Sequence, residues 1–129
     1  FDDGLYAAAR LLEILAQFPG DADAFFEQFP QDVSTPEINV SVVDEEKFAI
    51  IETLAREGDF GEGIKTTLDG IRVDYTDGWG LCRASNTTPA LVLRFEGKDS
   101  AALARIRELF EKALHGVAPT LTIPATTTA

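Results

Sequence analysis

The chain has 129 residues, enough for one compact domain with a small attachment but not for two full domains. Its 45% hydrophobic and 26% charged residues are typical of a globular protein, and no apolar run approaches the roughly 20 residues that span a bilayer. With 22 acidic and 11 basic residues the net charge is −11, which argues against nucleic acid and anionic membrane surfaces as partners.

Cysteine content and the first residue add two expectations. The single cysteine, Cys82, cannot form an internal disulfide, and no secretory signal pattern is visible. A cytoplasmic, monomeric protein is therefore expected. The sequence begins at Phe1 and contains no methionine, which favours a fragment of a longer protein.

Residues 1–30 predict two helices. Apolar residues recur at helical spacing from Leu5 to Phe18, and Pro19-Gly20 ends this first helix. A short second helix is expected to begin at Asp21, which can cap it. Because two such helices cannot bury their apolar faces alone, this segment is expected to be the end of a preceding domain.

A linker, a strand and a helix are expected next. Residues 31–36 should be an extended linker, because the residue before Pro36 is pushed out of the helical region. Ile38, Val40 and Val42 alternate with polar residues, which predicts a strand with one buried face. Asp44 is expected to cap a helix with apolar positions at Phe48, Ile51, Leu54 and Ala55.

A strand meander follows, with Asp69-Gly70 and Asp77-Gly78 marking hairpin turns. Asp99 is expected to cap a final helix. The element order predicts an α+β domain over residues 37–116, with an antiparallel sheet of four to five strands packed with two helices. Residues 117–129 have nothing to pack and are expected to be disordered.

The loop from Arg83 to Pro89 is unusually polar for a connection between two strands. Arg83 can hold an oxyanion with two charge-assisted hydrogen bonds. Ser85, Asn86 and Thr87, with the loop amides, can satisfy the remaining oxygens. The same residues also suit a solvated turn, so the pattern alone leaves phosphate binding and a plain polar loop both open.

Other chemically capable residues have simpler interpretations. His115 suits a helix end, and Cys82 suits a buried strand position. Trp79 and Tyr75 flank a hairpin turn, where packing is expected, although stacking on a sugar stays open. The acidic run Asp21–Asp23 suits a helix start better than a metal site. No catalytic residue and no metal ligand is expected.

Several segments occur together in a specific order and spacing: DDGLYAAARLLEIL, STPEINVSV, KFAIIETL, TTLDGIRVDY, WGLC, RASNTTP and LVLRFEG. They resemble the end of the third domain and the C-terminal domain of the bacterial phosphomannomutase/phosphoglucomutases, in the α-D-phosphohexomutase superfamily. The resemblance covers nearly the whole chain, from Asp2 to about His115, and implies a TBP-like C-terminal domain.

The resemblance also implies specific roles for residues of this chain. It implies contacts to the phosphate of a bound phosphosugar from Arg83, Ser85, Asn86 and Thr87. It implies a hinge between the last two domains at Ser34, Thr35 and Pro36. The loop residues Ala84, Asn86 and Thr88 favour the mannose/glucose group over phosphoglucosamine mutases.

For the intact enzyme, the resemblance implies interconversion of hexose 1-phosphate and hexose 6-phosphate through a phosphoserine and a bisphosphorylated sugar. It implies Mg²⁺ and a sugar 1,6-bisphosphate activator, neither bound by this fragment, with the parent's remaining domains as partners. The loops for the phosphoserine, metal and sugar choice are not in this sequence, so the fragment is expected to be inactive. A non-catalytic phosphosugar- or anion-binding module and a phosphoglucosamine mutase-type relative are the alternatives.

Overall fold

The computed structural model describes residues 2–125 of the chain. These residues form two compact units, one ending at Gln31 and one beginning at Asp32. Among the described residues, no helix is both long enough and apolar enough to cross a membrane.

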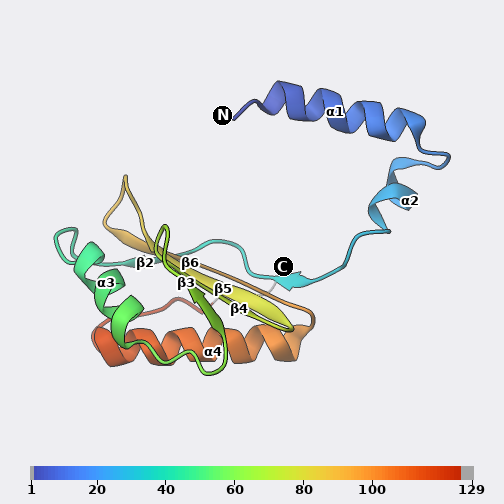
Figure 1. Cartoon of the computed structure of the whole chain (residues 1–129). Helices are drawn as coiled ribbons and strands as arrows, with labels where there is room; N and C mark the ends of the chain where they lie inside the picture. The colour runs from blue at the N-terminus through green and yellow to red at the C-terminus, as the bar shows by residue number, and fades with distance from the viewer. Residues whose placement is uncertain (1, 126–129) are drawn as a thin grey trace. The chain divides into compact units, whose positions relative to one another are not determined.

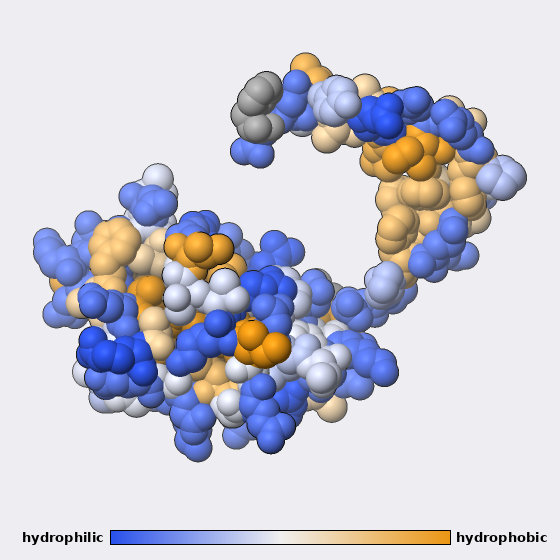
Figure 2. Space-filling view, viewed as in Figure 1, coloured by the Kyte–Doolittle hydropathy of each residue, from blue (hydrophilic) through white to orange (hydrophobic). Residues whose placement is uncertain are grey.

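The N-terminal unit contains the two predicted helices, α1 (Gly4–Gln17) and α2 (Ala22–Phe26). The carboxylates of Asp3 and Asp21 accept hydrogen bonds from backbone amides in the first turns, as N-caps do. No residue of either helix is buried, and Leu5 and Leu12 are among the exposed apolar side chains. Figure 2 shows the resulting apolar surface of this unit in orange.

The second unit is an antiparallel sheet with two helices on one face (Figure 1). The strands follow the order β1-β6-β5-β4-β3, and β2 also pairs with β6. The predicted α+β class is confirmed. In chain order the elements are β1 (Val33–Ser34), β2 (Ile38–Ser41), α3 (Lys47–Glu57), β3 (Ile64–Thr66), β4 (Ile71–Tyr75), β5 (Gly78–Ala84), β6 (Ala90–Gly97) and α4 (Ser100–Val117).

The sheet has six strands instead of the four to five that the sequence predicts. The additional strand, β1, lies within the predicted linker 31–36, where Val33 pairs with Gly97 and Ser34 with Glu96. Strand β2 continues along the same side of β6, with Ile38 opposite Leu93 and Ser41 opposite Ala90. Residues 33–41 therefore accompany β6 along its whole length.

The core lies between the sheet and the helices. Alternate residues of the strands point toward α3 and α4, because successive side chains of a strand face opposite sides. The ring of Phe110 on α4 packs 4.7 Å from the Phe60 ring and 5.3 Å from the Phe95 ring, measured between centroids. A Cβ at Gly80 would lie 2.4 Å from the Phe110 ring, so glycine at this position makes room for it.

Both predicted hairpins form, but the second turn is centred one residue earlier than expected. Thr76 and Asp77 form the turn, and Gly78 already pairs with Tyr75 as the first residue of β5. A Cβ at Gly78 would lie 2.2 Å from the carbonyl oxygen of Glu96. Glycine at position 78 is therefore required by the close approach of β6.

The start of α3 differs from the prediction. The helix begins at Lys47, and the Asp44 carboxylate accepts a hydrogen bond from the Lys47 side chain instead of capping the helix. Phe48 is 58% exposed, whereas Leu54 is fully buried. Phe48 lies about 120° around the helix from Leu54, outside the face that packs on the core.

The predicted disorder from residue 117 onward is wrong for the described part of the tail. Helix α4 continues to Val117, and the side chains of Leu121 and Ile123 pack against the core. The Arg107 guanidinium also donates to the carbonyl oxygen of Pro124 at 2.9 Å. Two apolar side chains and a backbone acceptor therefore hold a segment whose composition suggests disorder, while residues 126–129 lie outside the described residues.

Candidate functional site

A hollow of about 550 Å³ lies where the β5–β6 loop meets strand β2. The side chain of Arg83 reaches it from β5, between the buried neighbours Cys82 and Ala84. Arg83 therefore projects from the sheet face opposite the helices. Thr87 lines the same hollow from the loop, and Asn39 lines it from β2.

Arg83 is the only basic residue among the described residues that line the hollow. Its side chain is 35% exposed, and its nearest Nη lies 3.8 Å from a carboxylate oxygen of Asp69, which is itself largely exposed. An exposed ion pair of this length contributes little, so a bound anion can compete for the guanidinium. A Cβ at Gly70 would lie 2.7 Å from the Arg83 Cα, and Gly70 has a φ of +80°. Only glycine fits behind Arg83 there.

Ser85 organises the loop. Its Oγ accepts hydrogen bonds from the Thr88 hydroxyl at 2.8 Å, the Thr88 amide at 3.2 Å and the Thr87 amide at 3.4 Å. The Ser85 amide donates to the carbonyl oxygen of Ala90 at 2.9 Å. These three donors share the two lone pairs of the serine oxygen, and the hydroxyl proton of Ser85 is left as a possible donor to a ligand in the hollow that it lines.

The structure gathers three of the four predicted phosphate-binding residues around the hollow. Arg83, Ser85 and Thr87 line it, whereas Asn86 is exposed on the loop and is not among the lining residues. All four assignments to phosphate binding stay predictions.

Sequence reasoning missed the β2 side of the hollow, which Glu37, Asn39 and Ser41 form. The Asn39 amide donates to the Glu37 carboxylate at 3.4 Å. Alternation placed Asn39 and Ser41 on the polar face of a strand, but nothing local in the sequence shows that β2 pairs with β6. Knowledge of that pairing would have found these residues.

Residues 37–113 match the family described as phosphoglucomutase/phosphomannomutase, C-terminal domain. The chain belongs to this family. A phosphomannomutase/phosphoglucomutase of Pseudomonas syringae is 58% identical over 124 residues, and a phosphoglucomutase of Neisseria gonorrhoeae is 49% identical over 113. These alignments cover 96% and 86% of this chain but only 27% and 24% of the relatives. The predicted family resemblance is confirmed.

A solved structure supports the fold of this phosphoglucomutase/phosphomannomutase C-terminal domain. A phosphoglucomutase/phosphomannomutase family protein from Burkholderia thailandensis matches with a TM-score of 0.84 and 45% identity, over 97% of this chain and 26% of that protein. A probable phosphoglucosamine mutase of Methanocella arvoryzae is 29% identical over 104 residues, which are 81% of this chain and 23% of that relative.

Two of the three residues of the predicted hinge, Ser34 and Thr35, are bonded to the sheet of the family domain. Ser34 belongs to β1, and Thr35 is buried. The Thr35 amide donates to the Phe95 carbonyl at 2.9 Å, and the Thr35 hydroxyl oxygen accepts from the Phe95 amide at 3.1 Å. Pro36 is exposed. The hinge assignment of these three residues stays a prediction.

The described residues do not fit a magnesium site. Residues 2–125 contain no group of three or more histidine, cysteine, aspartate or glutamate side chains that could hold a metal ion. Asp21 instead accepts the amide hydrogen of Ala24 as a helix cap.

The aromatic and histidine candidates have structural partners. The guanidinium of Arg72 lies 4.2 Å from the Trp79 ring centroid, and the Trp79 indole donates to Glu96. The Tyr75 hydroxyl donates to the Phe60 carbonyl, and burial raises its pKa. His115 lies in the last turn of α4, as predicted, with Nε2 3.2 Å from the Leu121 carbonyl oxygen.

Cys82 is fully buried in β5, as the strand pattern predicts, and burial raises the pKa of its thiol to about 12. Only the thiolate reacts with disulfide reagents, so at pH 8 we expect the folded domain to react at least about 10³-fold more slowly than the chain unfolded in denaturant. Spectrophotometric thiol titration with and without denaturant measures this ratio. Rapid labelling of the folded protein would contradict it.

The same pKa shift has a consequence for stability. Above the ordinary thiol value of 9.0 the unfolded chain loses the thiol proton, whereas the folded chain keeps it up to about 12. The unfolded state then binds fewer protons, so the free energy of unfolding falls as the pH rises through this window. Comparing its pH dependence in wild type and Cys82→Ala isolates this contribution, which the variant should lack.

Proposed function

We propose that this chain holds the phosphate of a phosphosugar in an enzyme that interconverts hexose 1-phosphate and hexose 6-phosphate. The observation that carries the proposal is the hollow beside β2, where Arg83 meets the hydroxyl-bearing residues Ser85 and Thr87. The enzyme names of the relatives support the reaction, although the chain spans only about a quarter of their length.

The lining residues suit a phosphate monoester. A guanidinium matches two phosphate oxygens with parallel hydrogen bonds, and such charge-assisted bonds are about twice as strong as neutral ones. Ser85 and Thr87 add hydroxyl donors, and Asn86 on the same loop can add an amide donor when ligand binds. Among the described residues that line the hollow, Glu37 is the only acidic one. Its carboxylate can accept a hydrogen bond from a sugar hydroxyl.

In the parent enzyme this chain would bind the phosphate group of the sugar that does not take part in the transfer. A phosphoserine and magnesium, supplied by other parts of the protein, would act at the other phosphate. Phosphoryl transfer depends mainly on positioning and charge stabilisation, so an anchor at the distant phosphate contributes to rate as well as to binding. Movement of the domain about a hinge would bring the anchor onto the bound sugar.

The relatives favour a hexose phosphate over a glucosamine phosphate as the substrate. Identity is 58% to the Pseudomonas phosphomannomutase/phosphoglucomutase and 29% to the probable phosphoglucosamine mutase. The identities of residues Ala84, Asn86 and Thr88 also favour a mannose or glucose phosphate over a glucosamine phosphate. Together these support a mannose- or glucose-type substrate.

A titration of the 129-residue chain with mannose 1-phosphate, followed by NMR, tests the phosphate site. Resonances of residues 83–88 should shift, with an affinity on the order of millimolar or weaker because a single phosphate contact region offers little binding energy. Mannose without phosphate is the matched control and should shift none of them. Unmoved resonances at saturating phosphosugar would refute the site.

A coupled mutase assay tests where catalysis lies. With mannose 1-phosphate and a sugar 1,6-bisphosphate, this chain alone should produce no turnover. Turnover would show that the chain contains its own catalytic groups. Two results together would instead support a separate binding module. The chain would bind phosphosugar, and a substitution of Arg83 would leave the activity of the parent enzyme unchanged.

A further inference from the structure

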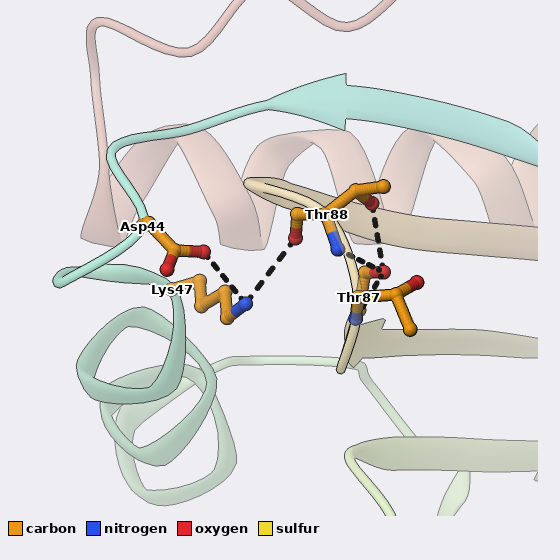
Figure 3. A network of polar contacts seen from close by, with 5 residues as sticks. Asp44, Lys47, Thr87 and Thr88 are labelled. Carbon is orange, nitrogen blue, oxygen red and sulfur yellow. Dashed lines mark hydrogen bonds and ion pairs between the residues drawn. The ribbon is translucent and has the colours of Figure 1, made fainter.

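Lys47 is a buried cation that bonds to the β5–β6 loop, residues 85–89, which we call the phosphate loop, but it does not line the hollow. It is the first residue of α3, and only 4% of it is exposed. Its ammonium group donates to the Asp44 carboxylate at 2.7 Å and to the carbonyl oxygen of Thr88 at 3.2 Å (Figure 3). Lys47 and Thr88 are 41 positions apart in the sequence.

Burying a lysine is costly unless it gains specific partners. An apolar side chain of the same length would fill the space without removing an ammonium group from water, and such replacements are often neutral or stabilising. Packing alone therefore does not explain Lys47. Its bond to Thr88 supplies a further reason, because Thr88 belongs to the loop that carries Ser85 and Thr87.

Thr88 is held from two sides. Its carbonyl oxygen accepts from Lys47 and from the Ala90 amide, at 3.2 and 2.9 Å. Its own amide and hydroxyl donate to Ser85 Oγ. Figure 3 shows Lys47 reaching the Thr88 carbonyl from the start of α3. Lys47 and Ser85 are therefore both bonded to Thr88, Lys47 at its carbonyl and Ser85 at its amide and hydroxyl.

We propose that Lys47 is a positioning residue for the phosphate loop. By holding the Thr88 carbonyl it keeps Ser85 aligned with Arg83 on the hollow before any ligand arrives. Preorganised donors bind an anion more tightly because no ordering is required during binding. This inference rests on the proposed phosphate-binding function, and it assigns Lys47 no contact with the ligand.

The role of Lys47 can be tested in the 129-residue chain by measuring the Kd for mannose 1-phosphate by NMR titration. Lys47→Met keeps the length of the side chain and removes the donor. We expect its Kd to rise about 5- to 10-fold, since bonds to charged groups that orient the site are lost. Lys47→Arg, which keeps a cationic donor, should recover part of the affinity.

Lys65→Met is the matched control. The Lys65 ammonium also donates to two backbone carbonyls, those of Ala55 and Gly58, but Lys65 is exposed and neither acceptor belongs to the loop. The Kd of Lys65→Met for mannose 1-phosphate should equal the wild-type value. Thermal unfolding of both methionine variants separates loss of alignment from loss of folding, because Lys47→Met should change the affinity while the folded state persists.

The outcomes distinguish this inference from the proposed function. Wild-type affinity in Lys47→Met, together with lost binding in Arg83→Ala, would overturn the positioning role and leave the phosphate site intact. Wild-type affinity in Arg83→Ala would overturn the phosphate site itself. If Lys47→Met does not fold, Thr88→Val is the substitute variant, because it removes the hydrogen bond from the Thr88 hydroxyl to Ser85 Oγ. Wild-type affinity in Thr88→Val would overturn the positioning role.

Discussion

Arg83→Ala should lower kcat/KM of the intact enzyme about 10²- to 10³-fold, the loss expected when two hydrogen bonds from a charged donor to phosphate disappear. Arg83 is the only basic side chain among the described residues that line the hollow. In the proposed function this phosphate contact also aligns the reacting end of the sugar, so kcat should fall and KM should rise. Steady-state kinetics with mannose 1-phosphate and an activating sugar bisphosphate measure both.

Arg72→Ala is the matched control for Arg83→Ala. Arg72 points from the same sheet face, but its guanidinium is bonded to Asp74 and stacked on Trp79, and it does not line the hollow. Its kinetics should stay close to wild type. Arg83→Lys should fall between the two, since an ammonium keeps the charge but cannot form the paired bonds. Equal kinetics for Arg83→Ala and Arg72→Ala would contradict the assignment.

Phe110→Ala should lower the free energy of unfolding by about 3–5 kcal/mol, the usual cost of removing a buried phenyl ring and leaving a cavity. Phe110 is fully buried between α4 and the sheet, where its ring contacts those of Phe60 and Phe95. Gly80 beneath it has no side chain that could fill the space. Urea denaturation of the chain, followed by fluorescence or circular dichroism, measures the change.

Phe48→Ala is the matched control for Phe110→Ala. The side chain of Phe48 is 58% exposed, so little apolar surface returns to water when it is truncated. The expected loss is below about 1 kcal/mol. Similar losses for the two variants would mean that Phe48 belongs to the core, as its place in the sequence first indicated.

The elements with strong local signals were predictable. Alternating apolar residues and Asp-Gly pairs predicted β4, β5 and their hairpin, and helical spacing after Asp99 predicted α4. Strand β1 was missed because two residues carry no periodicity, and only pairing with the distant strand β6 makes them a strand. Phe48 was misplaced because the first turn of a helix is hard to locate without its cap.

The candidate site shows the same division between local and distant signals. Arg83 at the end of β5 and Ser85 and Thr87 in the following loop are close in sequence, so local composition indicated an anion site as one of two interpretations, beside a plain polar loop. Asn39 reaches the hollow only through the pairing of β2 with β6, and Lys47 reaches Thr88 across 41 residues. Contacts of this kind depend on the packed fold, which a local pattern cannot show.

The pairing of β1 and β2 along β6 has a mechanical consequence. The chain enters the domain where Val33 pairs with Gly97, and the loop proposed to bind phosphate lies at the opposite end of β6, before Ala90. At about 3.4 Å per residue, β6 is a stiff lever roughly 24 Å long between these two points. A rotation of only about 10° at the entry would swing the loop by about 4 Å, enough to make or break every hydrogen bond to a phosphate.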